Sequence, residues 1–148
     1  MMWRLKMRMK AALTFRVLGY LAAAGVVLVG ATACSETNPG SNEATVAATR
    51  FHDHVRSGDP EGACSLLAPG TVEKLEDGEP GSCATKLRGL DLRAASSVLE
   101  SKAYGSDAQV VMDQDTVFLV QSGHSWKITA AGCTSRGERP YQCLVEGS

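Results

Sequence analysis

The stretch Ala108–Ala130, AQVVMDQDTVFLVQSGHSWKITA, decides the fold. Its runs of Val, Ile, Phe, Trp and Thr are separated by short polar turns, which is typical of antiparallel strands joined by hairpins. Trp126 and Ile128 alternate with polar residues, so the last of these strands should have one buried and one solvated face. Residues Val117–Val120 are apolar at every position, which predicts a central strand.

The same pattern continues on both sides of this stretch. We expect four strands connected as a meander and one final edge strand, at residues 97–104, 108–112, 116–121, 125–130 and 141–145. The connections are too short for parallel crossovers, so neighbouring strands should be antiparallel.

Residues before position 90 have a different period, because their apolar side chains recur every three or four positions. The pattern predicts a helix from an N-cap at Asn42 to a stop at Gly58. Its apolar face should consist of Ala44, Ala47, Ala48, Phe51 and Val55. Three shorter helices should follow at residues 60–67, 72–75 and 83–87, with Asp59, Thr71 and Ser82 as caps. This order predicts an α+β fold in which short N-terminal helices pack on an antiparallel sheet.

The composition allows one modest globular domain, since the chain has 148 residues, of which 44% are hydrophobic and 21% charged. The net charge of −1 is unevenly distributed. Residues 1–33 contain five basic residues and no acidic one, so the rest of the chain has 10 basic against 16 acidic side chains. A net negative body lacks the basic surface that a phosphate backbone requires, so no nucleic-acid partner is expected.

The N-terminal segment has the order of an export signal: a basic stretch, an apolar run at residues 17–29, and small residues at 30–33. As a helix the apolar run spans roughly 20 Å, whereas crossing the hydrocarbon core takes about 20 residues. We therefore expect residues 1–33 to be a cleaved signal peptide of the lipoprotein type. Residues 34–42 should be a flexible polar tether and residues 43–148 the folded domain.

Cys34 follows the signal directly. The segment Ala31–Cys34 resembles a bacterial lipobox, in which a diacylglycerol thioether forms on the cysteine before cleavage. Ala31 and Ala33 also suit an ordinary signal peptidase, which would leave Cys34 as a free or intermolecular thiol. Cysteine parity favours lipidation, because the chain has five cysteines and the other four can pair. The expected product is a palmitate-bearing lipoprotein on the extracytoplasmic face of the cell membrane.

The remaining cysteines are Cys64, Cys83, Cys133 and Cys143, and they allow three disulfide connectivities. We expect the pairs Cys64–Cys83 and Cys133–Cys143, since each pair then lies within one half of the chain. Zinc ligands normally come in closely spaced pairs such as C-x2-C, and no cysteines are that close here. No metal and no other cofactor is expected.

The histidines and aspartates are expected to be structural. His52 and His54 are two positions apart on a helix and point about 200° away from each other, so they cannot bind one metal ion. Both should lie on a solvated helix face, and His124 should lie in an exposed turn. Asp113 and Asp115 should shape the turn between two strands rather than reach a cavity.

The other charged segments have similar interpretations. The acidic segment 73–79 should be a solvated loop. Arg136 and Arg139 should pair with local carboxylates or carbonyls, with an anionic ligand as the alternative. The sequence contains no nucleophile elbow, phosphate-binding loop or H-E-x-x-H motif, so no catalytic residue is assigned.

Several segments resemble the NTF2-like family of SnoaL- and ketosteroid-isomerase-like proteins, and especially its small cysteine-paired lipoproteins from high-GC Gram-positive bacteria. These segments are Ala48–Phe51, Ser57–Asp59, Ala63–Pro69, Asp115–Leu119, Trp126 and Gly132–Cys143. The resemblance implies a curved antiparallel sheet that forms a cone with the helices packed on it. Enzymes of this superfold place an Asp or His base inside the cone, but the lipoprotein group implies no activity.

The sequence therefore predicts a non-enzymatic exported lipoprotein whose domain binds a small apolar molecule or a membrane-protein partner. One alternative is a small-molecule enzyme of the isomerase or dehydratase type that uses the cone, and another is an accessory of a neighbouring membrane protein. A cavity of roughly 300 Å³ or more with a buried carboxylate or histidine would favour the enzyme.

The core should bring Phe51 and Trp126 together between the first helix and the sheet. Truncating either to Ala should then cost roughly 3–5 kcal/mol. His52 and His54 should each tolerate Ala within about 0.5 kcal/mol.

Overall fold

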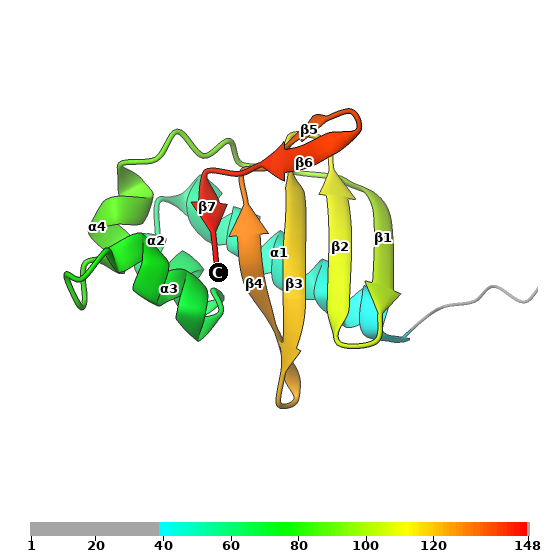
Figure 1. Ribbon diagram of the computed structural model, residues 1–148, viewed down its shortest axis with the longest axis horizontal. Coiled ribbons are helices and arrows are strands. Elements are labelled where there is room, and N and C mark those ends of the chain that lie inside the picture. Colours follow the sequence, from blue (N-terminus) through cyan, green and yellow to red (C-terminus); the bar gives the residue numbers. More distant parts are fainter. Residues whose placement is uncertain (1–38, 148) are drawn as a thin grey trace, which may run out of the picture. The chain divides into compact units, whose positions relative to one another are not determined.

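The computed structural model describes residues 39–147 (Figure 1). In this part of the chain the helices come first: α1 (Pro39–Ser57), α2 (Pro60–Ser65), α3 (Pro69–Glu76) and α4 (Cys83–Arg88). The strands follow: β1 (Val98–Tyr104), β2 (Asp107–Met112), β3 (Thr116–Ser122), β4 (Ser125–Ala131), β5 (Thr134–Arg136), β6 (Arg139–Gln142) and β7 (Val145–Glu146). The predicted α+β class is confirmed.

Five strands form an antiparallel sheet in the order β1-β2-β3-β4-β7. The predicted meander is confirmed, and β3 is the central strand that its apolar sequence predicts. Pairing of Val110 with Val117 and of Leu119 with Ile128 places apolar side chains on the same face of the sheet. The sheet is open and is not curled into the expected cone, and β7 adds only two residues to the β4 edge (Figure 1).

The C-terminal edge strand expected at residues 141–145 is divided in two. β6 pairs with β5 in a separate hairpin, and β7 pairs with the end of β4. The division falls at Cys143, which is bonded to Cys133, and at Leu144, whose N–H donates to the Gly132 carbonyl. These two links tie the chain between β6 and β7 to Gly132 and Cys133, the residues that directly follow β4.

Helix α1 begins at Pro39, three positions before the expected N-cap at Asn42. Proline suits the first helical turn, where its missing N–H would have no intrahelical acceptor. Residues 39–42, which the composition assigned to the tether, therefore belong to the helix. Its end at Ser57 agrees with the prediction, since Gly58 follows with a left-handed φ of 70°.

The short helices are capped differently from expectation at two places. Asp59 caps α2 as predicted, but α3 begins at Pro69, so Thr71 lies inside the helix and donates its hydroxyl to the Thr129 carbonyl. Ser82 makes no side-chain cap bond at α4. Instead the carboxylate of Glu76 accepts the N–H groups of Gly81 and Cys83, so the acidic segment is partly structural.

The core lies between α1 and one face of the sheet, behind the strands in Figure 1. Phe51 and Trp126 are both buried there, as predicted. On the other face of the sheet, Tyr141 of the β5–β6 hairpin lies edge-on against Phe118, at a centroid distance of 5.1 Å, and its hydroxyl accepts a hydrogen bond from Gln109.

Both predicted disulfides are present. Cys64–Cys83 joins α2 to α4, and Cys133–Cys143 closes the β5–β6 hairpin. In the chain-entropy model each bridge contributes about 3 kcal/mol by limiting the unfolded state. Within residues 39–147, none of the helices is long and apolar enough to span a bilayer. Cys34 and the predicted signal peptide lie outside the described residues.

Candidate functional site

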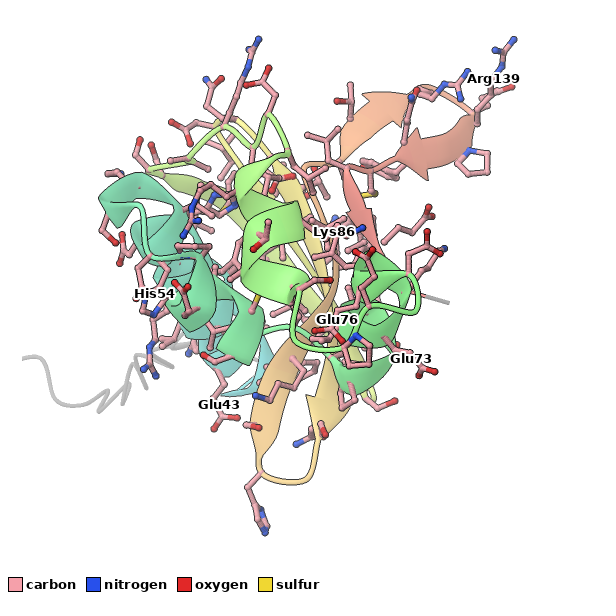
Figure 2. The ribbon with its side chains drawn as sticks, turned by 90° about the vertical axis from the view of Figure 1, so that its left-hand side faces the viewer. Glu43, His54, Glu73, Glu76, Lys86 and Arg139 are labelled. Carbon is pink, nitrogen blue, oxygen red and sulfur yellow. A yellow bond between two sulfur atoms is a disulfide. The ribbon has the colours of Figure 1, made fainter. Side chains whose placement is uncertain are left out.

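A surface cleft of about 430 Å³ opens where the end of α1 meets α2, α4 and the loop after α4. Polar and apolar atoms line it about equally, and the apolar side chains are those of Val55, Pro60, Ala63, Leu87, Leu90 and Leu92. Three side chains with polar heads also line it, namely His54, Asp59 and Arg88. Figure 2 labels His54 on this helical side of the domain. The Cys64–Cys83 bridge links two of the helices that form the walls, which limits how far the cleft can open.

His54 and Asp59 form a hydrogen-bonded pair in this cleft, with 2.8 Å between His54 Nδ1 and Asp59 Oδ2. The other carboxylate oxygen of Asp59 accepts the N–H of Gly62 and thereby caps α2. The Gly62 hydrogen bond, followed by the bond from His54, lowers the pKa of Asp59. Asp59 is therefore ionised at neutral pH, and Nδ1 of His54 carries the hydrogen that it accepts.

Gly62 makes room for this pair. A Cβ atom at position 62 would overlap His54 Nδ1 and Asp59 Oδ2. Glycine inside a helix costs roughly 0.5–1 kcal/mol relative to alanine. The presence of glycine at position 62 is therefore explained by the His54 imidazole that packs against it. It is not explained by the helix α2, which alanine would favour.

Arg88 lies at the end of α4, on the rim of the cleft. Its nearest ionic partner is Glu61, at 3.9 Å, and the side chains of both residues are more than 60% exposed. At this distance the guanidinium makes no direct hydrogen bond to the carboxylate. Arg88 therefore keeps its planar set of donors available to a further group.

A second His–Asp pair lies inside the core. The N–H of Ala95 donates to His52 Nδ1 at 3.1 Å, which places the hydrogen of the neutral ring on Nε2. Nε2 lies 3.1 Å from Asp115 Oδ2, an ion-pair distance at which the atoms are not aligned as a hydrogen bond. The Asp115 carboxylate also accepts the N–H groups of Gly132 and Cys133, at 2.8 and 2.7 Å. The pair thus links α1, the segment before β1, β3 and the start of the hairpin.

The expectation that His52 is solvated was wrong, whereas Asp115 lies in the β2–β3 turn as predicted, where its carbonyl accepts the Met112 N–H. Both side chains are only 1% exposed, because His52 continues the fully buried row of Ala44 and Ala48 at intervals of four residues. That interval was the sequence signal for its burial. Truncation of His52 to Ala is consequently no longer expected to be tolerated. Neither residue lines the cleft between α1, α2 and α4, so the pair is separate from that candidate site.

Asp113 shapes the β2–β3 turn, as predicted. Its carboxylate accepts the N–H groups of Ser96 and Ser97 and the hydroxyl of Ser96. These bonds, of which the Ser96 N–H is the strongest influence, lower the pKa of Asp113 to about 2. The carboxylate therefore fixes the segment that leads into β1.

Other cavities on the described part of the chain include one beside α1 and one beside the β5–β6 hairpin. One, of about 460 Å³, lies between α1 and β4 and is lined by Arg50, Trp126 and Lys127, and by His124, which lies in an exposed turn as predicted. The Trp126 indole N–H is buried without an acceptor among residues 39–147. The other cavity, of about 470 Å³, lies beside the β5–β6 hairpin.

Arg136 and Arg139 face each other across the β5–β6 hairpin. Figure 2 shows Arg139 at the outer end of this hairpin. Neither side chain makes an ion pair or hydrogen bond within the described range, so the expected pairing with local carboxylates or carbonyls was wrong. Their exposure in a two-stranded hairpin keeps them fully hydrated, which explains why no partner is required.

No group of three or more His, Cys, Asp and Glu side chains in the described part is placed to bind a metal ion. Comparison of the chain with protein-family models, with curated proteins and with solved structures found no match. The fold and the site define a disulfide-braced α+β domain with an amphipathic surface cleft.

Proposed function

We propose that the chain is an exported lipoprotein, anchored to the extracytoplasmic face of the cell membrane by a lipid on Cys34, and that its folded domain is a non-catalytic binding domain. The observation that carries this proposal is the cysteine pairing. Cys64, Cys83, Cys133 and Cys143 pair with one another, which suits an oxidising compartment. Cys34, directly after the signal-like segment, is then the one cysteine left for another chemistry.

The short distance between Cys34 and α1 supports a role at the membrane. Pro39 follows Cys34 by five positions, so a fully extended chain spans at most about 18 Å between them. A domain on so short a tether would stay beside the bilayer. Its ligand or protein partner would then be found at the membrane surface rather than in free solution.

The cleft between α1, α2 and α4 supports binding of a small molecule with an apolar body. Its volume falls within the range of ~300–1,000 Å³ that is common for ligand sites. Its leucines and Val55 offer apolar surface beside the polar groups of His54, Asp59 and Arg88, and sites for small molecules combine these two kinds of group. The Cys64–Cys83 bridge keeps the cleft preformed, which reduces the entropic cost of binding.

We also propose kinship with the NTF2-like family that the sequence resembles. Support comes from the order of the elements, with helices before an antiparallel meander, and from the packing of α1 on one face of that sheet. The chain would then be a member of the family whose sheet is open instead of forming the expected cone.

The lipid anchor is tested by metabolic labelling with an alkyne palmitate in a bacterium that processes lipoproteins. The full chain should be labelled and should remain in the membrane fraction. Cys34→Ala should lose the label and appear in the medium or as an unprocessed precursor. Ser35→Ala is the matched control, because it alters the neighbouring residue and keeps the thiol, so it should behave like the parent.

Labelling and membrane association that are the same in Cys34→Ala and in the parent would refute the lipoprotein proposal. A mature chain that begins at Cys34 but carries no label would favour ordinary signal-peptidase cleavage, and would refute the lipoprotein proposal equally.

A further inference from the structure

We propose that the cleft between α1, α2 and α4 binds a small organic monocarboxylate, whose carboxylate pairs with Arg88 and whose apolar body lies against the leucines of the cleft. This inference rests on the proposed binding function and specifies the chemical class of its ligand. Three features of the cleft support it: the hydrogen bonds that its polar groups already make, the charge on its walls, and the position of its apolar side chains.

Arg88 is the reason why we expect the ligand to be an anion. The pairs around it are already made: Asp59 uses one oxygen for His54 and the other for Gly62. The guanidinium of Arg88 has only the distant Glu61 as an ionic neighbour within the described residues, at 3.9 Å. A guanidinium offers two parallel N–H donors that match the two oxygens of a carboxylate.

Asp59 sets the limit on ligand charge. Its lowered pKa keeps a negative charge on the same wall of the cleft. Arg88 and Asp59 carry opposite charges that cancel, so a monoanion paired with Arg88 brings the summed charge of these groups only to −1. A phosphate dianion would bring a second negative charge towards Asp59, and like charges in a partly desolvated cleft repel each other.

The apolar walls give the ligand its body. Leu90 and Leu92 follow α4, and both are half-buried against the core together with Val55. They offer apolar surface to a chain or ring that enters beside Arg88. Acetate, which lacks such a body, should therefore bind far more weakly than an arylalkyl acid of the same charge.

The test is isothermal titration of the full chain in non-ionic detergent, with detergent alone as the blank. The probes are 4-phenylbutyrate, its neutral analogue 4-phenylbutan-1-ol, acetate, and the dianion 3-phenylpropyl phosphate. We expect 4-phenylbutyrate to bind at least about 10-fold more tightly than each of the other three. The alcohol lacks the charge that pairs with Arg88, acetate lacks the apolar body, and the phosphate brings a second negative charge towards Asp59.

Arg88→Gln should weaken 4-phenylbutyrate binding by about 10-fold or more and leave 4-phenylbutan-1-ol unchanged. Arg93→Gln is the matched control, because Arg93 is also exposed but lines a different cavity. It should bind like the parent. Thermal midpoints of both variants should equal the parent's, since neither arginine is buried.

The proposal is overturned if no probe binds, if the alcohol or the phosphate binds as tightly as the acid, or if both arginine variants behave alike. These outcomes leave the lipid anchor untouched, because labelling at Cys34 is measured without ligand. Loss of the label in the parent would conversely leave the titration valid.

Discussion

His52 and His54 are two positions apart on α1, and each faces an aspartate. The distance is 3.1 Å to Asp115 for His52 and 2.8 Å to Asp59 for His54. The surroundings are opposite. In the inner pair both side chains are 1% exposed, whereas in the outer pair the exposures are 31% and 46%.

The two pairs differ in what they connect. The inner pair accepts backbone N–H groups from Ala95, Gly132 and Cys133, so it joins segments that are far apart in the sequence. The outer pair is local and leaves His54 Nε2 without a hydrogen bond among residues 39–147. Burial thus makes one His–Asp pair part of the core, while the more exposed pair lines the surface cleft.

The largest effect should come from removing the inner carboxylate. Asp115→Ala would leave the backbone N–H groups of Gly132 and Cys133 without their acceptor and would remove the carboxylate beside His52, at a position where the side chains are only 1% exposed. We expect a loss of about 3–5 kcal/mol in the free energy of unfolding, measured by urea denaturation. Asp107→Ala is the control, since Asp107 is exposed on β2, and it should change the value by at most about 0.5 kcal/mol. Equal losses in the two variants would show that Asp115 contributes no more to the free energy of unfolding than an exposed aspartate does.

The next effect separates the two histidines directly. His52→Ala should destabilise the protein by about 2 kcal/mol or more, because it removes a buried ring and the acceptor of the Ala95 N–H. His54→Ala should cost at most about 1 kcal/mol, because its pair is exposed to solvent. The same denaturation experiment measures both variants. A larger loss for His54 than for His52 would contradict the division of roles.

The difference between these histidines also shows what the sequence could predict. Phe51 and Trp126 were correctly placed in the core, because apolar residues that recur at helical or strand periods indicate a buried face. The disulfides followed from parity and spacing. His52 was missed because a polar residue was assumed to be solvated, although it continues the buried row of Ala44 and Ala48.

Other features were beyond the sequence for physical reasons. The partner of His52 is 63 positions away at Asp115, and a contact of that range depends on the register of β3 against α1. The cleft needs α1, α2 and α4 to meet, which no local periodicity specifies. The strand expected at residues 141–145 has the composition of one strand, but its division depends on the bond between Cys133 and Cys143.

A smaller effect should arise at the outer pair itself. In the parent, Gly62→Ala should destabilise the protein by about 1 kcal/mol, because the strain of overpacking exceeds the gain in helix propensity. In a His54→Ala background the same change should instead stabilise by about 0.5 kcal/mol, since Asp59 is then free to move away. A double-mutant cycle measures this coupling. If Gly62→Ala stabilises the parent as well, the glycine is not explained by the imidazole.

The smallest effect concerns Asp113, which is exposed like Asp59 but bonded to backbone N–H groups like Asp115. Its pKa of about 2 in the folded protein lies below the ordinary value of about 3.9. A lowered folded pKa stabilises the protein above pH ~4, and this contribution disappears as the pH falls towards 2. Asp113→Asn should therefore be less stable than the parent at neutral pH, and the difference should shrink between pH ~4 and 2 in urea denaturation. Ser96→Ala, which removes one of the three donors, should show a smaller change in the same window. If the difference in stability stays constant down to pH 2, the charge of Asp113 does not contribute to it. The hydrogen bonds to this exposed carboxylate would then not stabilise the fold through its ionised form, in contrast to what is expected for the buried Asp115.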